Sequence, residues 1–298
     1  MTDRTWIGGN SNNSVYAAAN WSVKGVPVAG DQLFVLNGTA NMPGGSLSGD
    51  TINLGVLNRL PQMTPVPASL TPVLNISGGA TAKVAVGGDF YTPTVNRSTI
   101  NVAGPSKVEI NSDTSTHAAG HADFKVNIAS GTMTGSVNLY NGKGTISGLG
   151  KFNNVKSSLL FGSLTIKSDM IGTGSTNLTF MHVELNDWVS AGQTFTLNPA
   201  SSLKIDRPGQ FHGVVVAATT PPGSVPPSEI DLVGIKADSY SITNDLLTLY
   251  AGSNVVDRLT LHGNAAHEFV GQGSSGVAIG INGQPAGVTP LPLHATGV

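Results

Sequence analysis

Two histidines and two aspartates near the middle of the chain have the spacing closest to a metal-binding motif. His117 and His121 are four residues apart, with Asp113 before them and Asp123 after them. Two histidines at this spacing face the same way on a helix and can share a metal ion. The polar run before His117 and Gly120 between the histidines are instead typical of a loop, where the spacing loses this meaning. We therefore predict no bound metal and no cofactor, with these four residues as the weak candidates.

Carboxylates are the second group of residues that could do chemistry. Enzymes that cleave polysaccharides need clustered acids, either paired for hydrolysis or combined with calcium and a basic residue for lyase chemistry. The acids of this chain are spread singly, and no two aspartates are adjacent. The best candidates for a carbohydrate site are Asp206-Arg207 near His212, and Asp187 beside Trp188. We predict that the protein is not an enzyme, and a carbohydrate-active lyase or hydrolase is the third-ranked alternative.

Two other motifs of catalysis and nucleotide binding are incomplete. The chain has no Gly-x-Ser-x-Gly elbow of the kind that presents a nucleophilic serine in hydrolases. The segment from Gly142 to Thr145, Gly-Lys-Gly-Thr, lacks the full spacing of a phosphate-binding loop and is not followed by a helical pattern. We interpret it as a turn.

Composition limits the classes of partner. Charged residues make up 11% of the 298 residues and the net charge is −2, with 15 Lys and Arg against 17 Asp and Glu. A nucleic-acid-binding protein would need a basic face, so we predict no nucleic-acid partner. The absence of cysteine excludes a disulfide framework. No apolar stretch approaches the length of a membrane-spanning helix, so we predict no membrane insertion.

The elements that must position these residues are short strands. A short pattern recurs in the middle of the chain, from about Leu70 to Ile205: two apolar residues flank one polar residue, and a small turn residue follows. This alternation of apolar and polar residues has the period of a β-strand. Leu74-Asn75-Ile76, Ile100-Asn101-Val102 and Val126-Asn127-Ile128 follow one another at a constant interval. Between them lie the secondary phrases Val84-Ala85-Val86 and Val108-Glu109-Ile110, at a slightly shorter interval. Two or more strands in each period of this length indicate the stacked coils of a β-solenoid.

The polar residues inside these phrases are often asparagines. We expect them to face outward and to form ladders along the stack of coils. A glycan-binding surface is the alternative role. The residues concerned are Asn75, Asn101, Asn127 and Asn138.

The N-terminal segment differs from the repeats and contains two of the three tryptophans. A solenoid end exposes an open core, and we predict that Trp6 and Trp21 form a structural cap over it. The same segment contains the motifs Trp6-Ile7-Gly8-Gly9, Asn20-Trp21-Ser22, Val26-Pro27 and Gly30-Asp31. With these motifs it resembles the opening coil of bacterial right-handed β-helix surface proteins of the autotransporter-passenger type. This resemblance implies a right-handed parallel β-helix with an adhesive or scaffolding use, and we expect it here without a signal peptide or a membrane barrel.

The predicted fold is all-β: a single-stranded right-handed parallel β-helix, or β-solenoid, with an N-terminal cap and a C-terminal β extension. Prolines mark a loop after the solenoid body because they cannot continue a hydrogen-bonded ladder. The predicted boundaries are 1–45 for the cap and opening coil, 46–218 for the body, 219–228 for the Pro-rich loop, 229–282 for the C-terminal β region and 283–298 for an extended tail.

From this scaffold we predict a non-enzymatic structural surface protein of a larger assembly. The residues from Met1 to Trp6 do not read as a secretory signal peptide. That favours a virion component at the virion surface, such as a capsid decoration or fibre-type protein. The alternative is a bacterial adhesin or extracellular matrix protein at the cell surface. The expected partners are other copies of the chain or other assembly proteins, with surface glycans as a further class.

Overall fold

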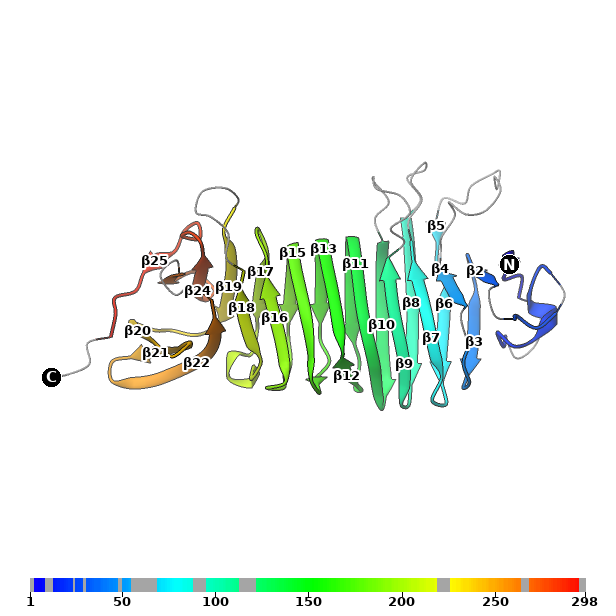
Figure 1. The fold of residues 1–298 in the computed structure, drawn as a ribbon, viewed down its shortest axis with the longest axis horizontal. Helices are drawn as coiled ribbons and strands as arrows, with labels where there is room; N and C mark the ends of the chain where they lie inside the picture. Colours follow the sequence, from blue (N-terminus) through cyan, green and yellow to red (C-terminus); the bar gives the residue numbers. More distant parts are fainter. Residues whose placement is uncertain are drawn as a thin grey trace. The chain divides into compact units, whose positions relative to one another are not determined.

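The computed structural model describes residues 3–8, 13–23, 25–28, 31–47, 50–54, 69–87, 95–112, 122–218, 226–263 and 268–294. Within these ranges the protein is all-β, as predicted, with two short 3-10 helices, η1 (Ala18–Asn20) and η2 (Pro208–Gln210), among the strands (Figure 1). None of the described helices has the length and hydropathy needed to cross a membrane. The chain forms two compact units, Met1–Asn153 and Asn154–Val298.

The first unit contains two ladders of parallel strands, and the chain alternates between them. The first ladder consists of β1 (Asp3–Thr5), β2 (Gln32–Val35), β4 (Thr51–Leu54), β7 (Thr81–Val86), β9 (Ser106–Ser112) and the first half of β11 (Thr132–Ser147). The second consists of β3 (Thr39–Pro43), β6 (Val73–Ser77), β8 (Val95–Ala103), β10 (Ala122–Ser130) and the second half of β11. A short strand, β5 (Ser69–Leu70), pairs with the start of β8.

The strand register of the first unit confirms the main repeat. Leu74 pairs with Ile100, and Ile100 pairs with Val126, so the predicted interval is the one that separates neighbouring strands. The shorter interval predicted for the secondary phrases is wrong, because Val84 pairs with Ile110 and not with Val108. The alternation could not distinguish the two, since shifting a strand by two positions leaves every side chain on the same face.

Alternation decides which side chains form the core of this unit. Leu74, Ile76, Ile100 and Val102 are at most 1% exposed, whereas the asparagines between them are partly exposed. Burying such a side chain contributes about 1.5–3 kcal/mol, and ordering one residue of backbone costs about 1–2 kcal/mol. A coil on its own therefore gains little, and its stability depends on the neighbouring coils that cover it.

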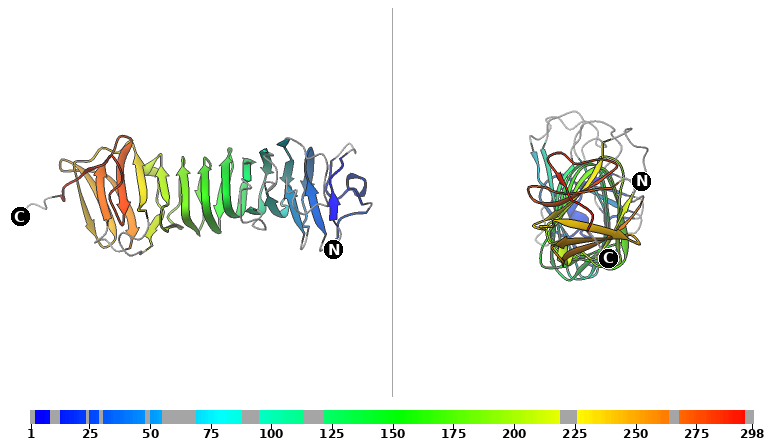
Figure 2. Two further views of the ribbon diagram at one scale, coloured as in Figure 1. Left: turned by 90° about the horizontal axis from the view of Figure 1, so that it is seen from above. Right: turned by 90° about the vertical axis from the view of Figure 1, so that its left-hand side faces the viewer.

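The second unit also contains two parallel ladders, seen from two further directions in Figure 2. The first consists of the first halves of β13 (Lys156–Ile166) and β15 (Gly174–Leu185), followed by β16 (Gln193–Leu197), β18 (Val214–Ala217) and the end of β22 (Asn254–His262). The second consists of the second halves of β13 and β15, followed by β17 (Ser202–Ile205) and β19 (Ser228–Val233). The remaining short strands are β12 (Lys151–Asn154), at the boundary of the units, and β14 (Met170–Ile171).

In the region expected as a C-terminal β extension, β19 and β22 pair parallel with the ladders above, and the strands pair antiparallel with one another. One group contains β20 (Ser239–Thr243), β21 (Leu246–Ala251) and β22, and the other contains β23 (Glu268–Gln272), β24 (Gly276–Ile281) and β25 (Thr289–Pro290). Strand β24 also pairs antiparallel with β19. Within the expected tail, Leu293 bridges to Tyr240 and the His294 ring stacks on Tyr250 with centroids 3.8 Å apart.

A buried polar network joins coils inside the second unit. Asn154 Nδ2 donates to Gln193 Oε1 at 3.1 Å and to Thr176 Oγ1 at 3.2 Å, and Ser157 Oγ donates to Asn154 Oδ1 at 2.6 Å. Gln193 Nε2 in turn donates to the carbonyls of Asn154 and Ile171. All four polar side chains belong to residues that are at most 2% exposed, so these bonds satisfy groups that water cannot reach.

Candidate functional site

Only one of the four weak metal candidates is among the described residues. Asp113, His117 and His121 lie outside the described residues, and Asp123 is on β10, where its backbone is in register with Arg97 on β8 and Lys143 on β11. Among the residues that the structure describes, no group of three or more His, Cys, Asp or Glu side chains could hold a metal ion.

The two tryptophans predicted to form a cap are in contact. Trp6 and Trp21 are 7% and 1% exposed, and their rings meet edge to face with centroids 5.2 Å apart. An antiparallel bridge joins their backbones, and Trp21 Nε1 donates to the Val15 carbonyl at 2.9 Å. Gly9 and Gly30 of the opening motif lie outside the described residues.

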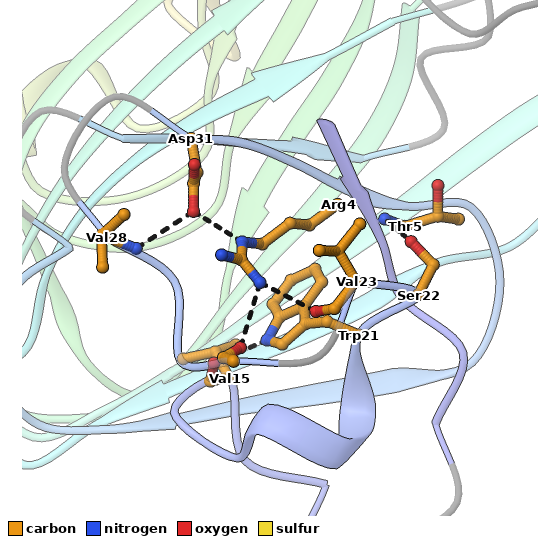
Figure 3. Close-up of polar contacts among 9 residues, drawn as sticks. Arg4, Thr5, Val15, Trp21, Ser22, Val23, Val28 and Asp31 are labelled. Carbon is orange, nitrogen blue, oxygen red and sulfur yellow. Dashed lines mark hydrogen bonds and ion pairs between the residues drawn. The ribbon is translucent and has the colours of Figure 1, made fainter. Parts of the chain in front are cut away.

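Beside Trp21, a buried ion pair fixes the loop between the first two strands (Figure 3). Arg4 Nε donates to Asp31 Oδ2, and Arg4 Nη1 donates to the carbonyls of Val23 at 2.8 Å and Gly25 at 3.1 Å. The same oxygen of Asp31 accepts the Val28 amide at 3.1 Å. The guanidinium thereby ties β1 to the segment that follows the Trp21 turn, which is a structural role.

The predicted asparagine ladder is present in the first unit. Asn75 donates to Asn41 at 2.8 Å, Asn101 to Asn75 at 2.8 Å, and Asn127 to Asn101 at 3.5 Å. Asn138 belongs to another row, where it donates to Asn111 at 2.8 Å. The side chains that alternate with the core therefore bond to the equivalent side chain of the next coil.

A set of polar and titratable side chains lies on the outward face of the second ladder of the second unit. We call this set the outer face. Its two in-register rows run across β13, β15, β17 and β19. The first row is Ser163, His182, Ser202 and Glu229, and the second row is Thr165, Glu184, Lys204 and Asp231.

Neighbouring side chains of the outer face satisfy one another. His182 Nδ1 lies 2.5 Å from Ser202 Oγ, and Lys204 Nζ lies 2.6 Å from Glu184 Oε1 and 3.1 Å from Asp206 Oδ1. Asp206 also accepts a hydrogen bond from the Asn186 amide. The two carboxylates beside Lys204 raise its pKa, with the hydrogen bond to Glu184 as the larger cause.

A shallow groove of about 250 Å³ runs over the outer face. It is smaller than an enclosed ligand pocket, which typically has about 300–1,000 Å³. Burial raises the pKa of Glu229 at its edge, and the charge of Asp231 raises it further, while His182 lowers it. The groove is lined by Ser163, Leu164, Thr165, His182, Val183, Glu184, Ser202 and Lys204.

Two phenylalanines stand at the corner where β13 and β15 enter the outer face. Phe161 and Phe180 are 41% and 40% exposed, and their rings stack with centroids 5.1 Å apart and planes 17° apart. Both residues have left-handed backbone angles, with φ of 56° and 51°. A bulky residue in this conformation costs about 1–3 kcal/mol. The fold therefore holds two strained aromatic residues in a place where they gain only part of the free energy of burial.

The acids and aromatics singled out in the sequence follow the C-terminal ends of β15 and β17. Arg207 Nη1 pairs with Asp187 Oδ1 at 3.1 Å, and the Trp188 and His212 rings meet edge to face with centroids 6.1 Å apart. The structure thus brings together the residues proposed as a carbohydrate site, as two contacting pairs.

Sequence reasoning missed the phenylalanine pair and the row of His182, Ser202 and Glu229. The sequence did contain a signal for the turn at Phe161 and Phe180, in the spacing of the buried residues on either side of it. Leu159 and Leu164 are both buried although an odd number of positions separates them, and Leu178 and Val183 repeat this odd spacing. An odd spacing breaks the alternation and therefore requires a turn between the two residues.

Comparison of the chain with protein-family models, with curated proteins and with solved structures gave no match. The sequence and the geometry described above therefore carry the functional argument.

Proposed function

We propose that this protein is a non-enzymatic β-solenoid that serves as a structural surface component of a larger assembly. The observation that carries the proposal is the side-by-side stacking of parallel strands in each unit. In the first unit the chain returns to pair with itself after coils of unequal length, a short one from Leu33 to Ile52 and a long one from Ala40 to Leu74. Such stacking buries a column of apolar side chains and presents rows of polar ones outward.

The cap supports a solenoid interpretation of the first unit. An open end of a coil stack exposes unpaired backbone and invites uncontrolled association. We propose that the buried Trp6 and Trp21, together with the pair of Arg4 and Asp31, form the closure of this end. The resemblance of this segment to bacterial right-handed β-helix surface proteins is consistent with the same proposal.

The assembly that we propose is a virion, on which the protein acts as a capsid decoration or fibre-type component. The alternative is a bacterial adhesin or extracellular matrix protein. Both uses require an extended polar surface that docks on partners, and the outer face of the second unit is such a surface.

Fractionation of lysates of the source culture tests this proposal. Particles are separated on a density gradient and the protein is quantified by mass spectrometry, with immunogold electron microscopy to locate it. We expect a fixed number of copies for each particle. Recovery on the cell envelope would instead support the adhesin, and recovery only as free protein would contradict both structural roles.

A further inference from the structure

We propose that the outer face of the second unit binds a neutral polysaccharide chain. In this arrangement the chain lies along β15, from the stacked rings of Phe161 and Phe180 to the pair of Trp188 and His212. The inference deepens the proposed function and rests on it, because it names a class of partner for a surface that docks without turnover.

The aromatic residues give the first argument. Phe180 lies within β15 and Trp188 follows the bend after the end of that strand, so a rise of at most about 3.3 Å per residue places their Cα atoms at most about 26 Å apart. Flat aromatic rings that precede and follow the groove residues of β15 along the chain suit the apolar C–H faces of pyranose rings, which follow one another in a polysaccharide. The strained backbone of Phe161 and Phe180 is further evidence, since strain retained at an exposed site points to a use for the side chain.

The corner that follows Phe180 adds to this argument. Ala200 occupies the next corner in the same left-handed conformation, with φ of 54°, and the Phe180 amide donates to the Pro199 carbonyl beside it. The stack of aromatic rings is thus not continued by a third ring. At this corner the neighbour of Phe180 carries only a methyl group.

The groove supplies the polar half of the site. The groove is lined by a hydroxyl, an imidazole, a carboxylate and an ammonium group, from Thr165, His182, Glu184 and Lys204. Contacts with one another and with Ser202 hold these groups in place. Sugar hydroxyls both donate and accept hydrogen bonds, so they can join such a mixed set of groups. Because the groups are already ordered, binding costs little side-chain entropy.

Charge indicates that the ligand is neutral. Glu184, Asp206, Glu229 and Asp231 bring four carboxylates to this face, while Lys204 is the cation that pairs with two of them. The pair of Asp187 and Arg207 adds no net charge. An acidic polysaccharide would meet a negative surface and would be repelled.

Affinity electrophoresis tests the inference. The full-length protein is run in native gels that contain dextran, mannan, galactomannan, glucomannan or soluble cellulose ether as neutral probes, and alginate or polygalacturonate as acidic ones. We expect retardation in at least one neutral gel and none in the acidic gels. Phe180→Ala and Trp188→Ala are each expected to weaken the retardation at least about tenfold, whereas Phe180→Tyr retains it. Leu149→Ala is the matched control, because Leu149 is an apolar side chain that is 97% exposed in the other unit.

Several outcomes would overturn the inference: no retardation in any neutral gel, retardation by acidic probes alone, or retardation that survives Phe180→Ala. Loss of particle association by Phe180→Ala without any glycan binding would also overturn it, because the occupant would then be a protein. Circular dichroism of each variant verifies folding, and alanine fits this corner conformation because Ala200 already adopts it. Failure here with intact particle association leaves the proposed function standing, so the two can be distinguished.

Discussion

Arg4 Nε lies 2.5 Å from Asp31 Oδ2, and the two side chains are 9% and 3% exposed. Removing one partner of a buried ion pair leaves the other charge without compensation, which typically costs about 3–5 kcal/mol. We therefore expect Asp31→Ala to lower the free energy of unfolding of the first unit by that amount, measured by urea denaturation followed by circular dichroism.

Two further variants make this prediction specific. The double variant Arg4→Met with Asp31→Leu removes both charges and is expected to recover part of the loss. Arg207→Ala breaks an ion pair whose side chains are 57% and 35% exposed, and it is expected to cost at most about 1 kcal/mol. Equal costs for Asp31→Ala and Arg207→Ala would contradict the structural role of the buried pair.

Substitution of Gln193 is expected to lower the stability of the protein more than its uncharged side chain would suggest. Gln193→Leu keeps the approximate volume but removes the side-chain donor to the carbonyls of Asn154 and Ile171 and one of the acceptors of the Asn154 amide. Each unsatisfied buried group costs about 1–3 kcal/mol. Thermal unfolding is expected to move to a lower temperature, whereas Thr194→Val, at the partly exposed neighbouring position, is the control and changes little. An unchanged melting temperature for Gln193→Leu would show that the network does not contribute.

Gly135 is needed because two strands approach closely. A Cβ atom at this position would lie 1.8 Å from the Val108 carbonyl oxygen on β9, so Gly135→Ala must displace backbone. We expect a loss of about 1–3 kcal/mol or more. Gly209→Ala is the matched control, because its Cβ would meet no atom within 4 Å and its φ is not positive. The comparison is made by urea denaturation, and similar stabilities of the two variants would refute the close approach.

The raised pKa of Glu229 is expected to make the stability of the protein fall as the pH rises. Its pKa in the folded protein is raised above the ordinary value of 4.5, first by burial and then by Asp231. The folded state therefore binds more protons than the unfolded state in the window above pH 4.5, and stability falls as the pH rises through it. Glu229→Gln is expected to raise the melting temperature at neutral pH and to have little effect below pH 4.5.

The reference for this experiment is Glu184→Gln, which removes a carboxylate that pairs with Lys204. That variant is expected to lower stability at neutral pH by at most about 1 kcal/mol, because the pair is largely exposed. A decrease of melting temperature in Glu229→Gln at the same pH would mean that its carboxylate stabilises the fold.

Much of the fold could be predicted because alternation is a local property. The strands, their core-facing side and the spacing of neighbouring strands could all be predicted from the positions of Leu74, Ile100 and Val126. The asparagines that alternate with these residues form the expected row. The antiparallel arrangement of β20 to β25 could not be inferred, because alternation is the same in parallel and antiparallel strands.

The outer face could not be predicted, because its rows depend on unequal coil lengths. The coil from His182 to Ser202 is shorter than the next one, from Ser202 to Glu229. No single period links these three residues, so only the strand register shows that they are neighbours. Asp187 and Trp188 were singled out by their residue types, but their partners also follow from the register and not from the sequence spacing.

The hydrogen bonds of the asparagine row all run in one direction. Asn75, Asn101 and Asn127 each donate to the asparagine of the preceding coil. Their amide dipoles therefore add along the row, as peptide dipoles do along a helix, and each bond polarises the next. The row is consequently a small electric dipole with its positive end toward Asn41 and its negative end toward Asn127, and replacing Asn101 alone would remove two of its three hydrogen bonds.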